Sequence, residues 1–201
     1  MALPMKIREG EMIWCGEHWI NYQKIGEDDK ITGMVSLYHT DYSPYGSGNT
    51  AYVICHDELD FEFICTDNRP LAGFIHDEMI KNKVLHFDKK FEIVDAGFKL
   101  EGDIVSSPRW QIDCGKHIIT AVWNDPDPAI VAYRPQEITQ NDYVFFSNLF
   151  FTDSAYIEVD GRRIKGKPYG RDIWIEVLGG GERSSCVFAL GETMIRPQRE
   201  G

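Results

Sequence analysis

Residues 59–65 read Leu-Asp-Phe-Glu-Phe-Ile-Cys, a stretch in which apolar side chains recur at every second position. Successive side chains of a β-strand point to opposite faces of the sheet, so positions 59, 61, 63 and 65 would share one wholly apolar face. The opposite face would carry Asp60 and Glu62. This period of two predicts a β-strand with one face on a hydrophobic core.

Similar short runs recur along the chain, separated by residues that favour turns. One example is Asp160-Gly161, a pair typical of a two-residue hairpin. No stretch long enough for a regular helix has helical periodicity, although 76–83 could form one short turn. About a dozen short strands predict an all-β fold, either an antiparallel barrel of the calycin or lipocalin type or a strongly bent β-sandwich. The other predicted strands are 34–38, 51–56, 71–75, 84–87, 91–94, 118–123, 129–133, 143–151, 155–159, 173–178 and 186–190.

The chain length of 201 residues suits one domain that buries a substantial core. We therefore expect 1–201 to form a single all-β domain. A rigid break, Asn-Asp-Pro-Asp-Pro at 124–128, could separate two sheets or half-barrels.

Charge and hydropathy narrow the choice of partners. The net charge is −11, which works against nucleic-acid binding because phosphates need a basic surface to neutralise them. An anionic membrane surface is unfavourable for the same reason. No apolar run approaches the roughly 20 residues that span a bilayer, and the first residues carry charges where a signal peptide needs an apolar stretch. We expect a cytoplasmic protein that binds neither nucleic acid nor membrane; exposed strand edges could pair it into a homodimer.

The cysteines are odd in number and contain no CxxC pair. Cys55, Cys65 and Cys186 fall inside apolar strands, where a free thiol acts as a small buried hydrophobe. Neither a disulfide framework nor a thiolate zinc site is expected.

A first candidate site is the stretch 38–45, which carries His39, Asp41 and Tyr45 where a strand runs into a loop. Histidine titrates near neutral pH, and a nearby carboxylate or phenol can orient it or relay a proton. At the mouth of a barrel these residues would form an acid/base cluster. The alternative is an exposed aromatic turn.

A second candidate is a near-repeat, Ile-Cys-His-Asp-Glu-Leu at 54–59 and Phe-Ile-His-Asp-Glu-Met at 74–79. In a strand, His56 and Glu58 would point to one side, as would His76 and Glu78. The two pairs could bind a divalent metal, which makes a metal-dependent β-barrel enzyme an alternative function. The same residues also suit the polar end of a strand.

A third candidate is the aromatic stretch 143–151, which is apolar on both strand faces apart from Ser147 and Asn148. Such a strand is buried on both sides or lines a cavity that holds an apolar ligand, and buried polar groups in it need partners. Ser147 and Asn148 could therefore bond a neighbouring strand or a ligand. Three tryptophans could add to the cavity: Trp110, Trp123 and Trp174.

The stretch 160–177, Asp-Gly-Arg-Arg-Ile-Lys-Gly-Lys-Pro-Tyr-Gly-Arg-Asp-Ile-Trp-Ile-Glu-Val, concentrates cations in an acidic chain. Its turn and first cations suit a hairpin with a protected edge. Its far end resembles the C-terminal signature of the lipocalin-like carotenoid hydratase (AttH-like) family, although Ile173 and Ile175 stand where that family has histidine and glycine. The matching positions are Gly161, Gly166, Tyr169, Asp172 and Trp174, with Trp19 and Tyr22 near the N-terminus.

The resemblance implies a lipocalin-like barrel and cofactor-free acid/base chemistry on a largely apolar molecule. It makes Asp172 the acid, with Tyr169 and Trp174 shaping the pocket. We therefore expect an enzyme of hydratase, isomerase or cyclase type, in which a buried carboxyl group protonates an alkene or carbonyl. His39 and Asp41 are the next choices, with Tyr45 as a hydrogen-bond donor. The alternative is a non-catalytic carrier of a small apolar or aromatic molecule.

Overall fold

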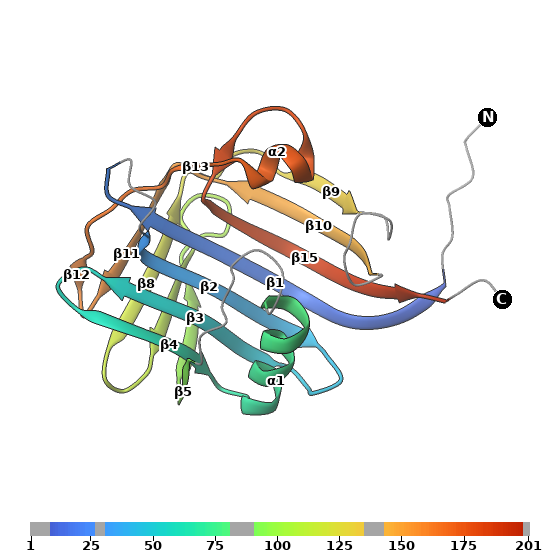
Figure 1. Cartoon of the computed structure of the whole chain (residues 1–201), viewed down its shortest axis with the longest axis horizontal. Coiled ribbons are helices and arrows are strands. Elements are labelled where there is room, and N and C mark those ends of the chain that lie inside the picture. The colour runs from blue at the N-terminus through green and yellow to red at the C-terminus, as the bar shows by residue number, and fades with distance from the viewer. Residues whose placement is uncertain (1–8, 27–30, 81–90, 135–142, 199–201) are drawn as a thin grey trace.

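The computed structural model describes residues 9–26, 31–80, 91–134 and 143–198, and β-sheet dominates it (Figure 1). An eight-stranded sheet has the strand order β5-β4-β3-β2-β1-β15-β10-β9, and a five-stranded sheet has the order β12-β11-β8-β7-β6. The all-β prediction is confirmed, and neither sheet closes into a barrel within the described residues. The strands of the larger sheet are β1 (Gly10–Lys24), β2 (Ile31–Tyr42), β3 (Gly48–His56), β4 (Asp60–Thr66), β5 (Glu92–Asp95), β9 (Ile130–Arg134), β10 (Val144–Phe151) and β15 (Cys186–Pro197).

The five-stranded sheet packs on one face of the larger sheet. Their shared core contains Trp19 and Leu37 from the larger sheet and Trp110, Trp123 and Ile157 from the smaller one, all of them buried. The predicted break at 124–128 carries the chain from β8 to β9, and so from one sheet to the other. The strands of the smaller sheet are β6 (Gly97–Glu101), β7 (Arg109–Asp113), β8 (Ile118–Asn124), β11 (Ser154–Val159) and β12 (Arg162–Arg163).

Short helices lie on the opposite face of the larger sheet (Figure 1). The helix α1 (Arg69–Phe74) continues into a π-helical turn, η1 (Ile75–Ile80). The helix α2 (Ile173–Leu178) lies in the connection between β13 (Gly170–Arg171) and β14 (Arg183–Ser184), which pair as a two-residue ladder. Among the described helices, none is long and apolar enough to cross a membrane.

Two of the predicted strands are wrong, because 71–75 and 173–178 are helical. The side chain of Asn68 accepts a hydrogen bond from the Leu71 amide, and a proline occupies the first turn, which are two signals for a helix start. Leu71 and Ile75 then bury one face of that helix at a spacing of four residues. Short apolar runs fit strands and helices equally well by pattern, and packing decides between them. The predicted strand 84–87 lies outside the described residues.

The cysteines behave as expected. All five are free thiols, and Cys55, Cys65 and Cys186 are buried. Burial raises the pKa of the Cys186 thiol to about 12, so this group stays protonated near neutral pH.

Candidate functional site

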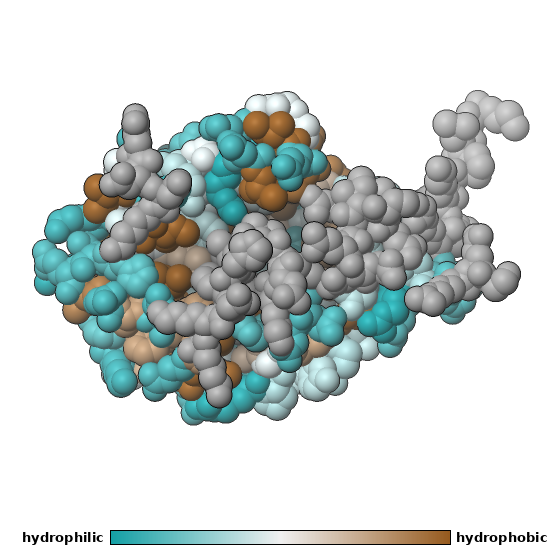
Figure 2. Space-filling model, viewed as in Figure 1, coloured by the Kyte–Doolittle hydropathy of each residue, from teal (hydrophilic) through white to brown (hydrophobic). Residues whose placement is uncertain are grey.

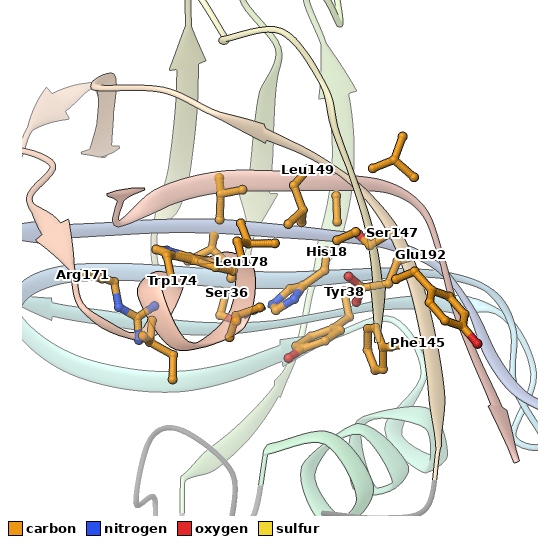
Figure 3. A pocket seen from close by; sticks show the side chains of 18 of the residues that line it. His18, Ser36, Tyr38, Phe145, Ser147, Leu149, Arg171, Trp174, Leu178 and Glu192 are labelled. Atoms are coloured by element: carbon orange, nitrogen blue, oxygen red, sulfur yellow. Dashed lines mark hydrogen bonds between the residues drawn. The ribbon is translucent and has the colours of Figure 1, made fainter. Parts of the chain in front are cut away.

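A cavity of about 470 Å³ lies between α2 and the helix-bearing face of the larger sheet (Figure 3). This volume lies in the range of small-molecule sites. Most of the lining is apolar and comes from strands β1, β9, β10 and β15 and from α2, with Ile20, Leu149, Val187, Trp174 and Leu178 among its residues. The polar side chains that reach it are His18, Tyr22, Ser36, Tyr38, Ser147, Arg171 and Glu192, with Tyr133 at the β9 edge.

His18 occupies the middle of the polar part of the lining. Its Nε2 atom lies 3.0 Å from the Ser36 hydroxyl oxygen, and its ring stacks on Tyr38 with centroids 4.0 Å apart. The surface that His18 still exposes faces the cavity, while protein surrounds the rest of the ring. Burial, helped by the positive charge of Arg171, lowers the pKa of His18 to about 3. The imidazole is therefore neutral at physiological pH, when it can accept or donate one hydrogen bond.

Glu192 reaches the cavity because β15 contains a β-bulge. Gly16 on β1 pairs with Glu192, but His18 pairs with Ala189, so β15 has one extra residue between these pairs. Strand β10 shows the same irregularity against β15. Gly191 sits in the bulge with a φ of +62°, a left-handed conformation that suits glycine. The extra residue reverses the alternation, so Glu192 faces the same side of the sheet as Val187 and Ala189.

The carboxyl group of Glu192 is buried, with 6% of the residue exposed. Burial raises its pKa to about 7, against a smaller lowering effect of the nearby Ser147 hydroxyl. The Ser147 oxygen is itself buried and has no partner of full hydrogen-bond geometry among the described residues, so it approaches the carboxyl group without completing a bond. A pKa raised towards neutral suits a group that both donates and accepts protons.

Helix α2 forms one wall of the cavity. The Trp174 indole nitrogen donates to the Ser184 carbonyl oxygen at 3.1 Å, and its ring meets Phe151 edge-on at 5.0 Å. These contacts hold the short helix against the sheet. Figure 2 shows the apolar residues of α2 gathered at the surface of the molecule, where Ile175 is exposed.

Of the residues predicted as catalytic, Asp172 stands between two lining residues in the sequence, Arg171 and Ile173, but does not itself line the cavity. It is the residue that precedes α2, its side chain is exposed, and it is not among the described lining residues. A hydrogen bond with Asp172 raises the pKa of the exposed Glu182 carboxyl. The segment after Asp172 is a helix and not the predicted strand, so strand alternation does not relate Asp172 to Trp174. Trp174 lines the cavity.

The predicted cluster of His39 and Asp41 does come together, but on the other face of β2. The His39 Nε2 atom lies 3.8 Å from the Asp41 carboxylate, and its Nδ1 atom lies 2.8 Å from the Asn49 side-chain oxygen. Odd-numbered residues of β2 face the smaller sheet, whereas Ser36 and Tyr38 face the cavity. Tyr45 is exposed, and its ring contacts Phe74 at 5.4 Å.

The predicted binding residues separate into two groups. Ser147 lines the cavity, whereas Asn148 points to the other face and donates to the Leu190 carbonyl oxygen at 3.2 Å. Trp110 is buried in the core between the sheets. Tyr169 is half-buried beside the cavity, with the Lys24 ammonium 4.3 Å from the centre of its ring.

The four residues of the metal alternative make separate contacts. His56 contacts Asp60 and Glu62, at 2.7 and 3.1 Å, and Glu58 pairs with Arg162. His76 lies 3.0 Å from the Tyr52 hydroxyl, and Glu78 accepts a hydrogen bond from the Tyr143 hydroxyl at 2.9 Å. The described residues contain no group of three or more histidine, cysteine, aspartate or glutamate side chains that could hold a metal ion.

Sequence reasoning missed His18, Arg171 and Glu192 as cavity residues. The alternation of side chains along β1 places His18 on the same sheet face as Ile20 and Tyr22, and this pattern could have revealed that face. No sequence pattern marks Glu192, because the bulge changes its face. Comparisons with protein-family models, with curated proteins and with solved structures found no match to this chain.

Proposed function

We propose that the protein is a cofactor-independent enzyme of hydratase, isomerase or cyclase type, which acts on a largely apolar small molecule in this cavity. The observation that carries the proposal is Glu192, a buried carboxyl group at the wall of an apolar cavity with a pKa raised to about 7.

Buried carboxyl groups are costly unless they are paired or neutral, and none of the ion pairs between described residues includes Glu192. A plain ligand carrier gains nothing from such a group, whereas an acid/base enzyme needs one. Glu192 therefore takes the role of proton donor that sequence reasoning assigned to Asp172.

In the proposed reaction, protonated Glu192 transfers its proton to an alkene or carbonyl of the substrate. The cation that forms then loses a proton from a neighbouring carbon, or is attacked by water, which gives up a proton. That proton returns to the Glu192 carboxylate, so the group regains its starting state. The aromatic faces of Tyr38 and Trp174 line the same cavity and would stabilise positive charge that develops on the substrate. Neutral His18 offers a hydrogen bond to the substrate.

The test uses the wild-type protein, Glu192→Gln and Asp172→Asn. Each is incubated with an organic extract of the cells that produce it, and bound molecules are identified by native mass spectrometry. We expect Glu192→Gln to accumulate a substrate that the wild type converts. If the substrate is protonated at an alkene, conversion in D₂O should place deuterium on a carbon of the product, because the acid exchanges its proton with solvent. Asp172→Asn should convert the substrate like the wild type.

The second candidate function is a carrier of an apolar or aromatic ligand, favoured by the large apolar share of the lining. A carrier would hold the same unchanged molecule in wild type and in Glu192→Gln, and D₂O would leave no deuterium on its carbons. That result would exclude the enzyme. Loss of conversion in Asp172→Asn but not in Glu192→Gln would return the role of the acid to Asp172.

A further inference from the structure

Arg171 is the one cation among the described residues that line the cavity. The backbone of β13 fixes its position, because Arg171 pairs with Arg183 of β14. Its guanidinium carbon lies 5.1 Å from the centre of the Tyr22 ring. Figure 3 shows Arg171 beside Trp174 at one side of the cavity and Glu192 with Ser147 at the other, with His18 between them.

The guanidinium of Arg171 has an aromatic contact but no carboxylate partner among the described residues. None of the ion pairs between described residues includes Arg171, although most of the other described arginines have one. Arg171 still acts electrostatically on the cavity, since its charge lowers the pKa of His18. A half-buried cation without a carboxylate beside an apolar cavity is the arrangement expected of a site for an anionic ligand group.

We propose that the cavity takes an amphipathic carboxylic acid, whose carboxylate binds Arg171 and whose apolar body extends past Trp174 towards Glu192. This inference rests on the proposed function and specifies its substrate class. A guanidinium matches a planar carboxylate with two parallel hydrogen bonds, and a single cation balances a single negative charge. A phosphate would bring up to two charges to the same lone cation.

The arrangement also separates the two ends of the substrate. The group that reacts at Glu192 lies along the apolar body, away from the carboxylate at Arg171. Because the pKa of Glu192 is raised to about 7, this carboxyl group is largely neutral in slightly acidic solution and does not repel an anion in the same cavity.

The experiment compares ligands that share one body and differ only in the head group. The neutral fluorophore N-phenyl-1-naphthylamine reports occupancy of the cavity, and octanoate, 1-octanol and octylamine compete for it at about pH 6, where octanoate is anionic and octylamine cationic. In the wild type, octanoate should displace the fluorophore at about tenfold lower concentration than 1-octanol, because a charge-assisted hydrogen bond contributes that much affinity. Octylamine should be the weakest competitor.

Arg171→Gln should remove the advantage of octanoate and leave 1-octanol unchanged, and Arg171→Lys should retain part of it. The matched control is Arg163→Gln. Arg163 also lies over a tyrosine ring, 4.4 Å from that of Tyr156, but it is exposed on β12 of the smaller sheet. The Arg163→Gln protein should bind all three competitors like the wild type. Circular dichroism should show that each variant is folded.

The outcomes separate this inference from the proposed function. The carboxylate site is overturned if octanoate and 1-octanol compete equally in the wild type. It is also overturned if Arg171→Gln and Arg163→Gln lose the same affinity for octanoate. In either case the apolar cavity stands. If neither the fluorophore nor any octyl compound binds the folded wild type, the cavity does not take apolar molecules and both proposals fail.

Discussion

The imidazole of His18 stacks on the phenol ring of Tyr38, with centroids 4.0 Å apart and ring planes inclined by 15°. The two residues are direct partners across β1 and β2, which brings their side chains together on one face of the sheet. A neutral imidazole is favoured there, because burial and the charge of Arg171 both disfavour its protonation. This pair sets the chemical character of the cavity centre, and its consequences can be measured.

The stability of the protein should fall as the pH falls below about 6.5, because of His18. The pKa of His18 is about 3 in the folded protein and near 6.5 when unfolded, so the unfolded state binds the extra proton between these values. Each pKa unit corresponds to about 1.36 kcal/mol, which gives a loss of up to about 5 kcal/mol over the window. Urea unfolding at several pH values should show a smaller loss for His18→Gln than for the wild type.

Other charged and titratable groups facing His18 are Arg171, Tyr22, Tyr38 and, across the cavity, Glu192. Of these, Glu192 also titrates in this range, and its effect has the opposite sign. The comparison of His18→Gln with the wild type isolates the histidine. Identical pH profiles for the two proteins would contradict a neutral buried His18.

Glu192 should cost stability as the pH rises from about 4.5 to about 7. In this window the folded protein keeps a proton that the unfolded chain loses, because the folded pKa of Glu192 is raised. Relative to wild type, Glu192→Gln should therefore gain about 3 kcal/mol in free energy of unfolding between pH 4.5 and pH 8. Chemical denaturation at both ends of the window measures the difference, and a constant offset would argue against a raised pKa.

The bulge that turns Glu192 to the cavity should depend on Gly191. Replacement by alanine should destabilise the protein by about 1 kcal/mol, because φ is +62° there while the new methyl group meets no atom closer than 3.9 Å. Gly191→Asn should cost less, since asparagine tolerates this conformation. Gly97→Ala is the control, because a methyl group at Gly97 has open space and an ordinary φ. Equal stability of the two alanine variants would contradict this role.

Trp174 should hold α2 in place. Trp174→Ala should lower the free energy of unfolding by about 2 kcal/mol, which is less than the cost at a fully buried tryptophan. The same variant should bind N-phenyl-1-naphthylamine more weakly. Trp174→Phe keeps a ring against Phe151 but loses the hydrogen bond to the Ser184 carbonyl, so it should fall between alanine and wild type. Unchanged fluorophore binding in Trp174→Ala would show that this wall does not shape the site.

Strand periodicity predicted the fold class because it is a local property. The stretch 59–65 coincides with most of β4, and Phe61, Phe63 and Cys65 face the core between the sheets, while Ile64 packs on the other face. The same reasoning failed at 71–75 and 173–178, where a short apolar run packs as a helix. Ser147 and Trp174 both line the cavity. The aromatic stretch 143–151 had pointed to Ser147, and the family resemblance had pointed to Trp174.

By itself, the chain's pattern of side chains determined an all-β protein with buried thiols, and it left open whether the aromatic stretch 143–151 lines a cavity or a core. The members of the cavity were determined by how distant strands pair. Glu192 follows a bulge, and one extra residue in β15 moves every later side chain to the opposite face. Arg171 and His18 meet there because β13 and β1 are neighbours of the cavity in space, although far apart in sequence. Local periodicity contains neither strand register nor long-range contacts, so the site existed only once the sheets were assembled.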